Sequence, residues 1–176
     1  MAMTPGFRKV ALTAHVASSV GWLGAVACFL GLAVAGLTSQ DAQVVRGAYI
    51  VMEPTGWFVL VPLAFASLLT GLVQALGTKW GVFQHYWVLA KLLINVVATI
   101  VLLAYMQTLR SLGGVAAEAT SSSDDLGALR SPSPALHAGA ALLLLIVATV
   151  LAVYKPWGMT RYGRRRRHEQ RAVSQR

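Results

Sequence analysis

The residues with the most evident chemical potential in this chain lie within apolar runs. Residues 86–105 read YWVLAKLLINVVATIVLLAY, in which Lys91 is the only charged residue. A charged side chain at bilayer depth is costly, and it usually faces a bundle interior or a functional pathway. Trp87, Asn95 and Thr99 stand at helical spacing from Lys91, so one helix face carries all four. We take Lys91 as a candidate cofactor-binding residue, with Asn95 as a hydrogen-bond donor beside it.

A second candidate stands near the start of the chain. His15 shares a helix face with Ser18, Ser19 and Trp22 in an uncharged run. A neutral imidazole is a common ligand of haem iron. The residue types therefore suggest His15 as an axial ligand of one haem b, with Lys91 as a second ligand or as the partner of a propionate.

A third polar face is predicted between residues 48 and 76. Its members recur alternately every four and three residues, which is the period of one helix face. Glu53 would stand at its outer end and Gln74, a further hydrogen-bond donor, at its inner end. A mid-helix proline, Pro62, predicts a kink. The stripe is Glu53, Trp57, Leu60, Ala64, Ser67, Gly71 and Gln74.

Lys91 also has a simpler interpretation. If the membrane begins near Trp87, Lys91 lies four residues inside it, about 6 Å at 1.5 Å per residue. From that depth a lysine can extend its amino group to the headgroups. The polar residues Asn95 and Thr99, deeper on the same face, favour an interior role. Both interpretations stay open.

The elements that must position these residues are membrane-spanning helices. Charged residues make up 12% of the 176 residues, against about 25% in a soluble domain. Three long apolar stretches lack Asp, Glu, Lys and Arg, and a fourth carries only Lys91. Each is longer than the ~20 apolar residues needed to cross a bilayer core. We predict an all-α fold, an integral membrane bundle of four antiparallel transmembrane helices within residues 1–157. The helices are expected near residues 10–37, 48–76, 84–109 and 134–155, with a long flexible loop over residues 111–133.

The distribution of Lys and Arg predicts the orientation. Arg8, Lys9, Lys79 and Lys155 share one side with the tail arginines, which places both termini in the cytoplasm. Residues 158–176 form a basic tail that we expect to be disordered.

The partners expected from composition are lipids. The cluster Arg164–Arg167 would attract anionic lipid, while no domain is present that would organise nucleic acid. A homo- or hetero-oligomer within the membrane stays open. The single cysteine excludes an intrachain disulfide and a CxxCH haem attachment.

Several short motifs resemble known membrane protein families. His15 precedes Trp22 by seven residues, and Trp87-Val88-Leu89-Ala90-Lys91 forms a Trp-x-x-x-Lys element. Met52-Glu53 and Ser67-Leu68-Leu69-Thr70-Gly71-Leu72 stand between them. In this order they resemble the HemJ-type protoporphyrinogen oxidases and, more distantly, CopD-like membrane domains.

The overall outline, from Val10 to Trp157, is similar to a family of small bacterial four-helix membrane proteins, a domain of unknown function. The HemJ resemblance implies haem or porphyrin roles for His15 and Lys91, with Trp87 beside them. Together these resemblances imply a multi-pass protein of a bacterial inner membrane.

Three functions follow as hypotheses. The first is binding of one haem b or porphyrin in the cytoplasmic leaflet, with His15 on the iron and Lys91, Gln74 and Asn95 around it. The second is a non-enzymatic scaffold or accessory subunit, in which the polar residues only join helices. The third is a small transporter, for which Glu53 and Lys91 are the membrane charges. Whether the protein is an enzyme is left open.

Overall fold

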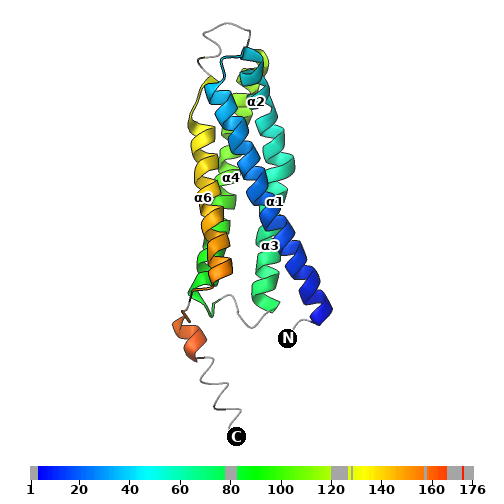
Figure 1. Cartoon of the computed structure of the whole chain (residues 1–176), viewed down its shortest axis with the longest axis vertical. Helices are drawn as coiled ribbons and strands as arrows, with labels where there is room; N and C mark the ends of the chain where they lie inside the picture. The colour runs from blue at the N-terminus through cyan, green and yellow to red at the C-terminus, as the bar shows by residue number, and fades with distance from the viewer. Residues whose placement is uncertain are drawn as a thin grey trace.

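The computed structural model is a bundle of long helices (Figure 1). The structure describes residues 4–77, 83–119, 127, 129–156, 158–165 and 172. Within these residues no strand occurs, apart from an isolated bridge between His85 and Met159. The elements in chain order are α1 (Pro5–Thr38), α2 (Ala42–Thr55), a π-helical turn (Gly56–Leu60), α3 (Val61–Gly77), α4 (Tyr86–Glu118) and α6 (Ser133–Tyr154).

Four of these stretches are long and apolar enough to cross a membrane, by length and composition. They are Pro5–Thr38, Ala42–Gly77, Tyr86–Glu118 and Ser133–Tyr154. Large apolar side chains also cover the outside of the bundle; Phe58 is 81% exposed and Val153 is 70% exposed. Apolar surface of this extent suits contact with lipid rather than water. For the part of the chain that the structure describes, the prediction of an all-helical protein with four such helices is therefore confirmed.

The spans run between two ends of the bundle (Figure 1). α1 begins, α3 ends, α4 begins and α6 ends at one of them, which we call the amino-terminal end. α1 packs against α2, α3 and α6, and α4 packs against the same three helices. A residue that faces inward from α1 can therefore meet residues of the second span, Ala42–Gly77, and of α6.

The second span is irregular near its middle. Its π-helical turn lies between Pro54 and Pro62, and the Val61 N–H donates to the Gly56 carbonyl. A proline lacks the N–H donor and crowds the carbonyl four residues earlier, so a wider turn before Pro62 relieves the conflict. The irregularity expected at Pro62 thus takes the form of a π-helical turn.

α4 is longer than predicted. We expected it to end near Leu109 and a loop to start at Ser111, but the helix continues to Glu118. The pair Gly113-Gly114 lies within the loop that was expected over residues 111–133. Gly113 instead lies in α4 beside the second span, where a Cβ would be 3.5 Å from Glu53 Oε2 and 3.6 Å from the Tyr49 carbonyl oxygen. Much of the predicted loop beyond it lies outside the described residues.

The segment after α6 contacts the start of α4. The Thr160 N–H donates to the Gln84 carbonyl at 3.0 Å, and the Tyr86 N–H donates to the Gly158 carbonyl at 3.3 Å. A short helical turn over residues 161–165 follows. The described start of the basic tail therefore lies against the bundle. Of the predicted lipid-binding cluster, Arg164 and Arg165 are exposed, while residues 166 and 167 lie outside the described residues.

Candidate functional site

Three helices meet at His15. The imidazole projects from α1, is only 8% exposed, and lies over Gly71 of α3. A Cβ at position 71 would lie 3.1 Å from His15 Cε1. Because glycine has no Cβ, the ring fits between α1 and α3 and reaches α4. Small residues at such crossings allow close helix approach in membranes.

Both ring nitrogens of His15 have a partner. Nε2 lies 3.0 Å from Lys91 Nζ on α4, and Nδ1 lies 3.0 Å from Thr70 Oγ1 on α3. A lysine ammonium carries only donors. His15 Nε2 must therefore accept from Lys91, and Nδ1 must carry the ring proton and donate to Thr70. This tautomer is assigned from the network, as it is for histidines in general.

The chain of hydrogen bonds ends on the backbone of α3. The Thr70 hydroxyl donates to the Ala66 carbonyl at 2.5 Å, which leaves its lone pairs for His15. The Ser18 hydroxyl donates to the His15 carbonyl at 3.1 Å and also lies 3.3 Å from Thr70 Oγ1. We call Lys91, His15 and Thr70 the polar relay. Each contact of the relay joins a donor to an acceptor when Lys91 donates to His15, His15 donates to Thr70, and Thr70 donates to the carbonyl of Ala66.

A second polar contact joins α1 to α3 about one turn farther from the amino-terminal end. Ser19 Oγ lies 2.9 Å from Ser67 Oγ, and Ser67 is 1% exposed. The faces that the sequence predicted for the first and second helices therefore do face one another along His15, Ser19, Ser67 and Gly71. Interhelical hydrogen bonds of this kind stabilise helix association in lipid.

The other two predicted site residues lie one turn from the relay, in opposite directions along the bundle. Gln74 follows Thr70 on α3, and its buried Nε2 has no acceptor among the described residues. Asn95 follows Lys91 on α4 and is 5% exposed; its backbone carbonyl accepts from the Thr99 hydroxyl at 2.8 Å. The structure thus joins His15 to Lys91 directly. Within the described residues, neither Gln74 nor Asn95 forms a side-chain hydrogen bond with them.

Thr70 is the relay residue that the sequence-based site did not include. The spacing of four and three residues selected Ser67 and Gly71 and passed over position 70. A usable signal was present, because Thr70 stands three residues after Ser67 and borders the same face.

The relay constrains iron binding at His15. Because Nε2 accepts from Lys91 and Nδ1 donates to Thr70, an iron on Nε2 would have to displace the Lys91 amino group. In the described part of the chain, no carboxylate forms an ion pair with Lys91, and no three His, Cys, Asp or Glu residues are grouped to hold a metal ion. His85 lies at the start of α4, where it pairs with Met159.

The opposite end of the bundle holds His137 and the predicted polar residue Glu53. His137 of α6 stacks on Tyr105 of α4 with ring centroids 4.0 Å apart. Its Nδ1 lies 2.9 Å from the Ser133 carbonyl oxygen and donates to it. Glu53 faces Gly113. Glu53 and Lys91 are therefore far apart along the bundle.

The fold and this site define a class, that of all-helical proteins with four helices able to span a membrane. No protein-family model, curated protein or solved structure matches the chain. These comparisons do not support the motif resemblance to HemJ-type oxidases and CopD-like domains. The chain is therefore assigned to this class and to no family within it.

Proposed function

We propose that the chain is a non-enzymatic accessory or scaffold protein of a bacterial inner membrane. In this proposal its four spans are antiparallel, both termini are cytoplasmic, and the amino-terminal end of the bundle lies in the cytoplasmic leaflet. The polar relay then serves to hold α1, α3 and α4 together rather than to bind iron.

The observation that carries this proposal is the pairing within the relay. Lys91, His15 and Thr70 come from three helices, and each finds its hydrogen-bond partner in the next, at 3.0 Å in both steps. A metal or substrate at His15 would have to displace Lys91 or Thr70 from the ring. Here neither nitrogen is free, which is the arrangement expected of a group that joins helices.

A second candidate function is haem or porphyrin binding, and one observation favours it. Lys91 bonds a neutral imidazole instead of a carboxylate, and Gln74 Nε2 is a buried donor without an acceptor among the described residues. Two such donors suit the propionates of a porphyrin. His15 would then ligate the iron, with Asn95 as a further donor. The transporter hypothesis has the least support, because its two membrane charges, Glu53 and Lys91, lie near opposite ends of the bundle.

An absorption spectrum separates the two candidates. The protein would be expressed with haem precursor supplied, purified in mild detergent, and scanned before and after dithionite. As a scaffold, it should show no band above the protein absorption at near-stoichiometric intensity. A Soret band with reduced α and β bands, abolished by His15→Ala but kept by His137→Ala, would overturn the scaffold function in favour of haem.

A further inference from the structure

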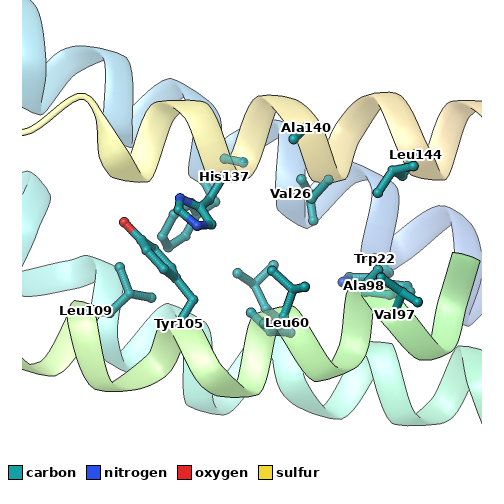
Figure 2. Close-up of a pocket in the computed structure, with 15 residues that line it drawn as sticks. Trp22, Val26, Leu60, Val97, Ala98, Tyr105, Leu109, His137, Ala140 and Leu144 are labelled. Carbon is teal, nitrogen blue, oxygen red and sulfur yellow. The ribbon is translucent and has the colours of Figure 1, made fainter.

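The bundle contains a cavity that lies apart from the polar relay. Its volume is about 120 Å³, and its lining comes from α1, the π-helical turn, α4 and α6. Figure 2 shows Trp22 near one end of the cavity, the stacked Tyr105 and His137 near the other, and Leu60 between them. Trp22 is two helical turns beyond His15 on α1, so the cavity lies nearer the middle of the bundle than the relay does.

Small residues create this space. Ala98 of α4 and Ala138 and Ala141 of α6 face it, where larger side chains would close the gap between these helices. Apart from Trp22, Tyr105 and His137, every lining side chain is apolar and carries no hydrogen-bonding group. The wall therefore suits the body of an apolar molecule.

The cavity has an opening toward lipid. Val97 and Val101 of α4 and Leu144 of α6 line it and are also 43%, 47% and 39% exposed. Since these three residues lie on the outer faces of α4 and α6, a molecule dissolved in the bilayer could enter between the two helices without crossing water.

One polar group in the wall has no partner. The Trp22 side chain is 2% exposed, and its Nε1–H has no acceptor among the described residues. In Figure 2 the indole nitrogen is on the side of the ring that faces Leu60 and the cavity. An indole N–H is a donor only, and leaving a buried donor unsatisfied is costly. A hydrogen-bond acceptor inside the cavity would therefore satisfy the Trp22 N–H.

Water fits this position poorly. A buried water is typically held by two to four polar partners, whereas this end of the cavity offers the single N–H of Trp22. At the far end, the Tyr105 hydroxyl lies 2.9 Å from Ser133 Oγ, and Figure 2 shows it directed away from the cavity. An organic oxygen attached to an apolar body satisfies Trp22 without needing other polar partners.

We propose that this cavity binds a lipophilic molecule of about one six-membered ring, whose carbonyl oxygen accepts the hydrogen bond of Trp22. Membrane-soluble ketones and quinones have this chemistry. The size follows from the volume, since an engineered cavity of about 150 Å³ holds benzene. Any tail on the ring would leave through the opening between α4 and α6. This site is independent of the relay and of the function proposed for it.

The test compares two probes that differ in one oxygen. Binding of para-fluoroacetophenone and para-fluoroethylbenzene to the full chain in lipid nanodiscs would be followed by fluorine NMR, with empty nanodiscs as the reference for lipid partition. The ketone should bind the wild-type protein roughly five- to tenfold more tightly, which is the effect expected of one hydrogen bond. Trp22→Phe should abolish that preference while still binding both probes.

Two further variants locate the site. Ala141→Phe fills the cavity and should prevent saturable binding of both probes, whereas Leu143→Phe, on the lipid-facing side of the same helix, should leave binding unchanged. Equal affinity of the two probes for the wild-type protein would overturn the assignment of Trp22. Binding that survives Ala141→Phe, or no saturable binding to the wild type, would overturn the cavity as a site.

Discussion

Replacing His15 with phenylalanine is expected to destabilise the protein by about 2 to 3 kcal/mol. The ring volume is nearly kept, but Lys91 loses the acceptor that lies 3.0 Å from its amino group. Hydrogen bonds to charged groups contribute about 1.5–3 kcal/mol, and a buried charge left without a partner is strongly destabilising. The free energy of unfolding in a bilayer mimetic would be the measurement. The same change at the exposed His137 should cost less than about 1 kcal/mol.

The double variant His15→Phe/Lys91→Met tests whether this cost comes from the contact between the two residues. Lys91→Met removes the charge, so in the His15→Phe background it should restore stability instead of lowering it further. The resulting double-mutant cycle should give a coupling of about 1 kcal/mol or more, within the range measured for hydrogen bonds between membrane helices. If the two costs simply add, His15 and Lys91 are not energetically coupled and the relay has no structural role.

The second large effect is expected at Tyr49. This side chain of α2 is completely buried, and its ring packs on α1 so closely that a Cβ on Gly36 would lie 3.0 Å from Tyr49 Cε2. Truncation to alanine leaves a cavity among tightly packed helices. Large aromatic truncations typically cost about 3–5 kcal/mol, and we expect Tyr49→Ala to fall in that range by the same unfolding measurement.

Tyr49→Phe is the matched control. It keeps the ring and removes only the hydroxyl, which donates to the Ser131 carbonyl across a long 3.4 Å contact. Its cost should stay below about 1 kcal/mol. Equal stability of the alanine and phenylalanine variants would show that the ring contributes little and that this part of the α1–α2 packing is described wrongly.

The spans and the inward faces could be predicted from the sequence because lipid imposes simple rules. Uncharged runs longer than a bilayer is thick must be helices, and polar residues at helical spacing must face inward. These two rules placed His15 on an interior face and favoured one for Lys91, while the alternative of a lysine that reaches the headgroups stayed open. They also identified Ser67 and Gly71 on the face that meets α1.

The details that the sequence did not predict depend on how helices rotate against one another. Thr70 enters the relay because the His15 ring, seated over Gly71, turns its Nδ1 toward position 70. Gly113 fell within the expected loop, yet it belongs to α4 and lies beside Glu53 and Tyr49. The cavity at Trp22 arises from three alanines on two different helices. The residue pattern within either helix alone does not predict it.

The polar relay is tested most directly by nitrogen NMR of isotope-labelled histidine in lipid nanodiscs. The chain has four histidines, and His15→Phe identifies the signals of His15. The relay predicts a ring proton on Nδ1, an unprotonated Nε2 in a hydrogen bond, and a shift of the Nε2 signal alone when Lys91 is replaced by methionine. A ring proton on Nε2, or an Nε2 signal that does not shift in Lys91→Met, would contradict the relay. His15 would then have a nitrogen available to bind iron.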